Sequence, residues 1–302
     1  MIRVPAHITG FFRPEIKDDP YQTGSLGAGF SVEKYVFTEI KRLKTPDIKI
    51  FFGSNEVSNT ACTSYCVAKT IKEKYEITEG FEVRHIFEVP IGCGLATSGA
   101  GALGTAFALN NEFSLNIHRV KLAQIAHIAE IKCKTGLGSV IAQYEGMFEI
   151  RLKAGAPGIG KVARIPIVEE VAILIYGPIL TKEILSSSEK LQKVSQAFGE
   201  KNLTLLEKFS VEKFCELSFS FAVESELMLN KIRHILDIAQ KYDLYGSMLM
   251  LGEGLFLFGD NLEMKIKKMI DSLGKDFRPK NVILTKIDNR GVEKVENNDQ
   301  PF

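Results

Sequence analysis

Apolar and polar side chains alternate in the early part of the chain and take up a helical spacing further on. Residues 81–89 alternate with period two, which predicts a strand with one buried face, and residues 47–52 alternate similarly. Residues 30–37 form a weaker strand candidate. Residues 60–75 and 118–132 are predicted to be helical, the second because its apolar positions recur every three or four residues. The three glycines Gly24, Gly27 and Gly29 predict a loop ahead of the weaker strand.

The second half of the chain mixes strands and helices without a strict alternation. The pattern predicts strands over 171–176, 255–258 and 281–287, and helices over 188–209, 219–242 and 262–273. The glycine- and proline-containing stretch 154–160 is the best candidate linker. This order favours an α+β sandwich in two halves over a doubly wound parallel sheet. We therefore expect an N-terminal domain over 1–153 and a C-terminal domain over 154–302.

The charge balance narrows the classes of partner. The 302 residues include 38 basic and 37 acidic side chains, for a formal net charge of +1. This near-balance argues against a large electrostatic footprint for nucleic acid or an anionic membrane. No apolar run approaches the roughly 18 residues that a membrane span needs, and the N-terminus lacks the layout of a signal peptide. We therefore expect a cytoplasmic protein.

The cysteines do not suggest a disulfide framework, because their number is odd and their spacing is scattered. The five are Cys62, Cys66, Cys93, Cys133 and Cys215. Cys62 and Cys66 are four residues apart and could share one helix face as half of a metal site. No second cysteine or histidine pair follows at zinc-site spacing. We expect buried apolar thiols, with a metal fragment as the alternative.

The segment most informative about chemistry runs from residue 90 to residue 101. Pro90 ends the preceding strand, glycines let the backbone turn, and Thr97 and Ser98 lead into a run of small residues that we predict to be a helix. Unpaired N–H groups at a helix start attract phosphate. A dinucleotide fingerprint is also present as letters over 99–104, but it lacks the expected strand and acidic residue. A helix that packs tightly through its glycines is the structural alternative.

This segment resembles the second motif of the GHMP kinases (galactose, homoserine, mevalonate and phosphomevalonate kinases), which reads Pro-x3-Gly-Leu-Gly-Ser-Ser-Ala. The matching residues are Pro90, Gly94, Leu95, Ser98 and Ala100. Further blocks resemble the pantoate kinase branch of that family, at residues 4–12, 24–29, 126–130, 135–138, 151–158 and 248–252. The resemblance implies a two-domain GHMP kinase fold. It also implies a homodimer that transfers a phosphoryl group from Mg·ATP to the 4-hydroxyl of pantoate, in coenzyme A biosynthesis.

The resemblance also implies roles for individual residues. Glu130 and Ser98 would coordinate Mg²⁺, and Arg151 would pair with the substrate carboxylate. Ser25 and His7 would contact the substrate, although a histidine in an early strand is more often a core residue. The nucleotide-binding residues would be Gly92, Gly94, Leu95, Ala96, Thr97, Ser98, Gly99, Ala100 and Gly101.

One position departs from the family pattern. The motif Thr-Gly-Leu-Gly-Asp supplies the usual candidate base, and this chain has Ser139 in place of the aspartate. A serine cannot act as a base at neutral pH. Phosphoryl transfer depends mostly on positioning and charge neutralisation, so turnover can persist without the carboxylate. The alternatives are a GHMP kinase for another hydroxy acid of the mevalonate or homoserine type, or a weakly active, substrate-trapping or non-catalytic ATP-binding homologue.

Overall fold

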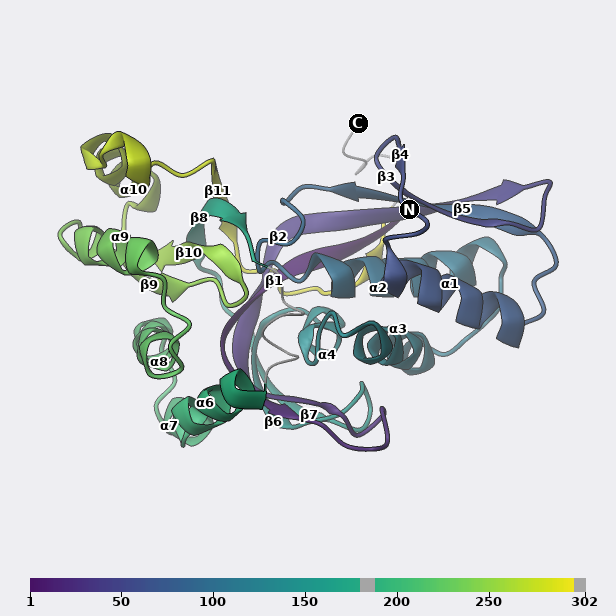
Figure 1. Cartoon of the computed structure of the whole chain (residues 1–302), viewed down its shortest axis with the longest axis horizontal. Coiled ribbons are helices and arrows are strands. Elements are labelled where there is room, and N and C mark those ends of the chain that lie inside the picture. Colours follow the sequence, from purple (N-terminus) through teal and green to yellow (C-terminus); the bar gives the residue numbers. More distant parts are fainter. Residues whose placement is uncertain (180–187, 296–302) are drawn as a thin grey trace.

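The computed structural model describes residues 1–179 and 188–295 (Figure 1). The elements up to residue 165 are β1 (Ile2–Glu15), β2 (Gly24–Leu43), β3 (Ile48–Phe52), β4 (Asn55–Glu56), α1 (Cys62–Lys74), β5 (Gly80–Phe87), α2 (Thr97–Glu112), α3 (Arg119–Cys133), α4 (Ser139–Gln143), β6 (Phe148–Lys153) and β7 (Lys161–Ile165). Those that follow are β8 (Glu170–Pro178), α6 (Ser188–Phe198), α7 (Lys201–Glu207), α8 (Val211–Glu224), α9 (Asn230–Gln240), β9 (Tyr245–Met248), β10 (Gly252–Phe258), α10 (Leu262–Ser272), a 3₁₀ turn (Lys275–Phe277), β11 (Asn281–Lys286) and β12 (Glu293–Lys294).

The larger sheet has the order β12-β1-β2-β5-β3-β4, with β6 also paired to β2 and β7 paired to β6. Its pairs are antiparallel except for β3 with β5. The long strand β2 has different neighbours at its two ends, because residues 27–30 pair with β6 and residues 36–43 pair with β5. Helices α1, α2 and α3 lie together on one side of this sheet (Figure 1).

The smaller sheet is antiparallel, with the order β11-β8-β10-β9. Helices α8, α9 and α10 surround it in the left half of Figure 1. The two sheets share one hydrophobic core: Phe30 of β2 lies 5.5 Å from Phe256 of β10, and Phe148 of β6 lies 4.7 Å from Phe214 of α8, between ring centroids. The α+β architecture with two sheets is therefore confirmed. Among the described residues no helix has both the length and the apolarity to cross a bilayer.

Helix α2 packs very closely on its neighbours, as its run of small residues predicts. A Cβ atom on Gly104 would lie 2.2 Å from the Thr38 hydroxyl oxygen on β2, a distance that excludes any side chain. Small side chains thus let the helix sit directly against the sheet. The structural alternative from the sequence is therefore true of the body of the helix, while its first turn is free for another role.

Three expectations about the chain's course are wrong. Gly24, Gly27 and Gly29 are not a loop but part of β2. Two of them are glycines because strand β1 approaches so closely: a Cβ atom on Gly27 would meet the Phe11 carbonyl oxygen at 2.2 Å, and one on Gly29 the Ile8 carbonyl oxygen at 2.3 Å. At Gly24 the close neighbour is the Gly155 backbone nitrogen, 2.6 Å from a Cβ atom. The two long helices expected over 188–209 and 219–242 are each interrupted. They form α6 and α7, and α8 and α9, respectively.

The segment 154–160 connects β6 to β7, which are antiparallel neighbours in the larger sheet. The chain changes sheet only after β7, and β12 returns to the larger sheet near the end of the described residues. The domain boundary at residue 153 therefore stays a prediction, with β7 and β12 completing the sheet that belongs to the first half.

The expectation of unpaired thiols is wrong for two of the five cysteines. Cys62, the first residue of α1, forms a disulfide with Cys133, the last residue of α3. Their Cα atoms are 6.1 Å apart although 71 residues separate them in sequence, a distance within the ordinary range for a disulfide. Cys66, Cys93 and Cys215 are free. Helix packing, which the spacing of cysteines cannot reveal, brings the pair together.

Candidate active site

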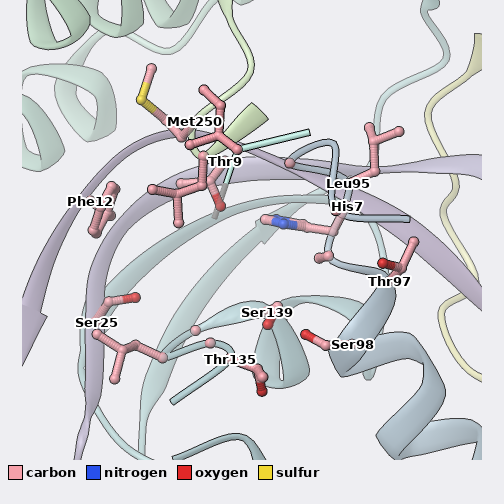
Figure 2. A pocket seen from close by; sticks show the side chains of 18 of the residues that line it. His7, Thr9, Phe12, Ser25, Leu95, Thr97, Ser98, Thr135, Ser139 and Met250 are labelled. Carbon is pink, nitrogen blue, oxygen red and sulfur yellow. The ribbon is translucent and has the colours of Figure 1, made fainter. Parts of the chain in front are cut away.

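A cavity of about 340 Å³ lies where the two halves of the molecule meet. Strands β1 and β2, the turn before α2 and the loop 134–138 form most of its wall, and the second half contributes the remainder (Figure 2). Ten of the residues proposed from the sequence border it: His7, Ser25, Gly92, Gly94, Leu95, Ala96, Thr97, Ser98, Ser139 and Arg151. Ile179, Met250 and Leu251 close it from the other side.

The turn into α2 presents the start of that helix to the cavity. Gly94 has a φ of 77° and Ala96 a φ of 54°, so the backbone reverses direction just before Thr97, the first helical residue. No side chain caps the helix, and Thr97 and Ser98 both border the cavity. Uncapped N–H groups and the positive end of the helix dipole favour an anion at this place.

Neighbouring elements hold this turn in a fixed position. The Gln143 side-chain amide donates hydrogen bonds to the Ala96 carbonyl oxygen at 3.1 Å and to the Pro5 carbonyl oxygen at 2.8 Å. Gly252 lies directly beneath the turn, since a Cβ atom there would be 2.2 Å from the Cys93 carbonyl oxygen. The block 248–252 therefore supports the turn through its backbone, and any residue larger than glycine at position 252 would displace it.

Beneath the cavity floor, the Glu130 carboxylate gathers three hydroxyl groups. Ser98 donates to Oε1 at 2.6 Å, Thr135 donates to Oε1 at 3.3 Å, and Ser139 donates to Oε2 at 2.5 Å. Glu130 is only 1% exposed. Burial raises the pKa of this carboxyl, and the hydroxyls of Ser139, Ser98 and Thr135 oppose that rise. Ser139 is thus a hydrogen-bond donor to Glu130.

The donor set at this point suits a hard cation only in part. Glu130 and Ser98 offer a carboxylate and a hydroxyl, both oxygen ligands of the kind that Mg²⁺ prefers. Among the described residues, no group of three histidine, cysteine, aspartate or glutamate side chains could hold a metal ion. Mg²⁺ usually keeps several waters and binds through one or two carboxylates plus substrate phosphates. The residues fit such a shared site.

The opposite wall carries a buried charged group. The Arg151 guanidinium on β6 is 2% exposed and donates through Nη1 to the Glu149 carboxylate. Glu149 also bonds His7 Nε2, at 3.1 and 3.2 Å. Burial lowers the pKa of Arg151, and the charge of Glu149 opposes that change. Arg151 Nε and His7 Nδ1 have no hydrogen-bond partner among the described residues, so the wall keeps polar groups available.

A second cavity of about 180 Å³ adjoins the first. Phe52, Phe87 and Ile91 give it an apolar lining, and the starts of α1 and α2 form much of its remaining wall. His85 also borders it, hydrogen-bonded to the hydroxyls of Thr38 and Ser64. Burial lowers the pKa of His85 to about 3, so the ring is neutral at pH 7. The two cavities share Ile91, Thr97, Ser98 and Thr135.

Some residues proposed from the sequence lie outside the larger cavity's wall. Glu130 lies under the floor, Gly101 borders the smaller cavity, and Gly99 and Ala100 border neither cavity. Four contributors were missed: Thr135, Gln143, Glu149 and the smaller cavity. Two of them had a readable signal: Thr135 begins the block 135–138 that resembles the family, and Glu149 stands two residues before Arg151 and thus on the same face of a strand.

This chain is similar in sequence and in fold to known kinases. Residues 63–146 match the model of the GHMP kinases N terminal domain. A pantoate kinase of Thermococcus kodakarensis is 36% identical over 89% of this chain and 91% of its own length. A pantoate kinase of Methanocaldococcus jannaschii is 36% identical over 83% of this chain and 90% of its own length. A solved structure described as a phosphotransferase related to the CoA biosynthesis pathway has a TM-score of 0.84, 31% identity and 97% coverage of both chains.

Proposed function

Since this chain belongs to the pantoate kinases of the GHMP kinase family, we propose that its cavity transfers the γ-phosphoryl group of ATP to the 4-hydroxyl of pantoate. The product, 4-phosphopantoate, serves coenzyme A biosynthesis. The observation that carries the proposal is the meeting of two features in one cavity: the uncapped start of α2 at Ser98 and the buried guanidinium of Arg151. One suits a phosphate and the other a carboxylate.

The nucleotide would occupy both cavities. The triphosphate would lie at the start of α2, held by backbone N–H groups and by Thr97 and Ser98. The base would enter the smaller cavity, whose Phe52 and Phe87 offer apolar surface and which shares Thr97 and Ser98 with the larger one. Mg²⁺ at Glu130 and Ser98 would supply neutralisation of the charge that develops on the phosphates.

Pantoate would lie against the opposite wall. Arg151 would pair with its carboxylate, because a guanidinium can bond both oxygens in one plane. Ser25 lies close to Gly138 and borders the same region, so its hydroxyl is placed to bond the substrate. The imidazole of His7 extends into the cavity from β1, across from Ser98 and Ser139 in Figure 2. It would contact a substrate hydroxyl, oriented by Glu149.

The proposal is tested by a substrate panel. We would measure ADP release with pantoate, homoserine and mevalonate, and identify the product by mass spectrometry. We expect kcat/KM for pantoate to exceed that for the other two acids by about 10²-fold or more, because their carbon skeletons place the hydroxyl and carboxylate differently. Preference for another acid would assign a different kinase. ATP binding in a calorimeter without any phosphorylated product would favour the non-catalytic alternative that Ser139 motivates.

Ser139→Asp should raise kcat by about tenfold with Mg·ATP and pantoate. General-base help is typically worth about 10²–10⁴-fold, and we expect part of it to be lost because the new carboxylate would stand beside Glu130, whose Oε2 is 2.5 Å from the Ser139 hydroxyl. Initial rates at saturating substrates provide the measurement. Ser139→Asn is the matched control, since asparagine has the same shape as aspartate but no carboxylate that could act as a base. Equal rates for the two variants would show that no base is needed at this position.

Three further features remain proposals: a homodimer, a cytoplasmic location, and a division into domains at residue 153. The family's homodimer motivates the first, and analytical ultracentrifugation of the purified chain would measure it directly.

A further inference from the structure

The disulfide between Cys62 and Cys133 stands in the wall that separates the two cavities. Cys133 borders the larger cavity and Cys62 the smaller one. Cys62 is the first residue of α1, and α1 has no side-chain cap and no acidic residue in its first turn. Cys133 is the last residue of α3 and leads directly into the loop 134–138, all of whose residues border the larger cavity.

The residues that follow each cysteine connect the disulfide to the buried carboxylate. The hydroxyls of Thr63 and Thr135 are hydrogen-bonded at 3.0 Å. Thr135 also donates to Glu130 at 3.3 Å, and Glu130 holds Ser98 and Ser139. A short series of bonds thus runs from the covalent link to the hydroxyls at the cavity floor.

The loop 134–138 is tied to its surroundings at both ends. At its near end the Lys134 N–H donates to the Ile131 carbonyl oxygen at 3.2 Å and the Thr135 N–H to the Glu130 carbonyl oxygen at 3.1 Å, which holds the loop to α3. The disulfide adds a covalent link from this end to α1, whose packing against α2 brings Ser64 close to Gly101. The far end is fixed where Ser139 bonds Glu130.

We propose that the Cys62–Cys133 disulfide positions the active site, so that the kinase activity depends on the oxidation state of this pair. The disulfide keeps the start of α1, the loop 134–138 and the Thr135–Glu130 hydrogen bond in one arrangement. Reduction by a phosphine breaks the S–S bond: the phosphine supplies two electrons, a water molecule supplies the two protons of the new thiols, and the oxygen of that water ends on the phosphine oxide. The loop and the start of α1 would then lose their covalent link and would be joined through the Thr63–Thr135 hydrogen bond. This inference rests on the proposed function for its assay.

The test compares oxidised with reduced protein at a temperature where circular dichroism shows both to be folded. Thiol titration in denaturant should find three free cysteines before reduction and five after it, in accord with the three unpaired cysteines and the five in the sequence. We expect reduction to raise KM for ATP and pantoate and to lower kcat/KM about tenfold, as a displacement of active-site groups by a fraction of an ångström can do. Reoxidation with oxidised glutathione should restore the original values.

Two variants separate positioning from stability. Cys133→Ser should reproduce the kinetics of the reduced protein, whereas Cys66→Ser, on the same helix α1 but outside the disulfide, should not. Thr135→Val keeps the disulfide and removes its hydrogen-bonded route to Glu130, so it should cause part of the same loss. If reduction unfolds the protein, the kinetics of Thr135→Val, in which the disulfide remains, test whether the hydrogen bond from Thr135 to Glu130 affects activity.

Several results would overturn the inference. Five free thiols in protein purified without reductant would mean that the disulfide does not form. A lower unfolding temperature with unchanged KM and kcat would assign the disulfide to stability only. Unchanged kinetics in Thr135→Val would remove the route to Glu130. Absence of phosphorylated pantoate from both oxidised and reduced protein is a different result, because it would reject the proposed function itself.

Discussion

Glu130→Gln should lower kcat with Mg·ATP about 10³-fold, a loss of the several kcal/mol that charge stabilisation by a metal ion typically provides. The substitution keeps the shape of the side chain and removes its charge. It also replaces one carboxylate oxygen, which accepts hydrogen bonds, by an amide nitrogen, which donates them. Three hydroxyl groups donate to the carboxylate in the wild type, so part of this hydrogen bonding is lost in the variant. Steady-state rates at saturating ATP, pantoate and Mg²⁺ are the measurement.

The control for this variant is Glu145→Gln, which removes a carboxylate that lies at the surface in an ion pair with Arg164. It should retain full activity. Two effects on the unfolding temperature of Glu130→Gln oppose each other, so we expect a small change. The charged form of a carboxyl whose pKa is raised by burial is unfavourable in the folded protein, and a neutral group removes that cost at pH 7, whereas the amide nitrogen weakens the hydrogen bonds from the hydroxyl groups. Rates within twofold of the wild type would reject a role for Glu130 in phosphoryl transfer.

Arg151→Lys should raise KM for pantoate about 10²-fold and leave KM for ATP within about twofold, because a lysine cannot bond both oxygens of a carboxylate in one plane. The positive charge is kept, so Glu149 retains a partner and the fold is preserved. Initial rates over a range of pantoate concentrations, at saturating ATP, provide the value.

Arg164→Lys is the matched control for this prediction. Arg164 lies on the neighbouring strand β7, also pairs with a glutamate, and does not border the cavity. It should leave both KM values unchanged. Equal increases in the KM values for pantoate and ATP in Arg151→Lys would indicate a general disturbance of the site. An unchanged KM for pantoate would show that a residue other than Arg151 binds the pantoate carboxylate.

Short-range signals in the sequence predicted the turn into α2 well. The glycines turn the backbone and the helix begins at Thr97, although β5 ends at Phe87, three residues before Pro90. Such short-range signals survive in the folded protein because the backbone geometry at a helix start depends mostly on neighbouring residues.

Long-range packing explains most of what the sequence could not predict. Glycine in isolation predicts a turn, whereas Gly27 and Gly29 lie inside β2, where the missing side chain makes room for the backbone of β1. The disulfide joins residues 71 positions apart, and no spacing rule for cysteines anticipates it. Glu149 was missed although its alternation with Arg151 places both on one strand face. That the two side chains form a buried ion pair follows only from the folded structure, in which the elements that cover them are in place.

The aromatic core that joins the two sheets has a consequence for how the chain folds. Phe30 and Phe148 come from the first half of the sequence, while Phe214 and Phe256 come from the second. These four rings bury one another, so severing the polypeptide at residue 153 would expose Phe30 and Phe148 on one fragment and Phe214 and Phe256 on the other. The cavity likewise takes Met250 and Leu251 from the second half, so its wall is complete only after that part of the chain has been synthesised.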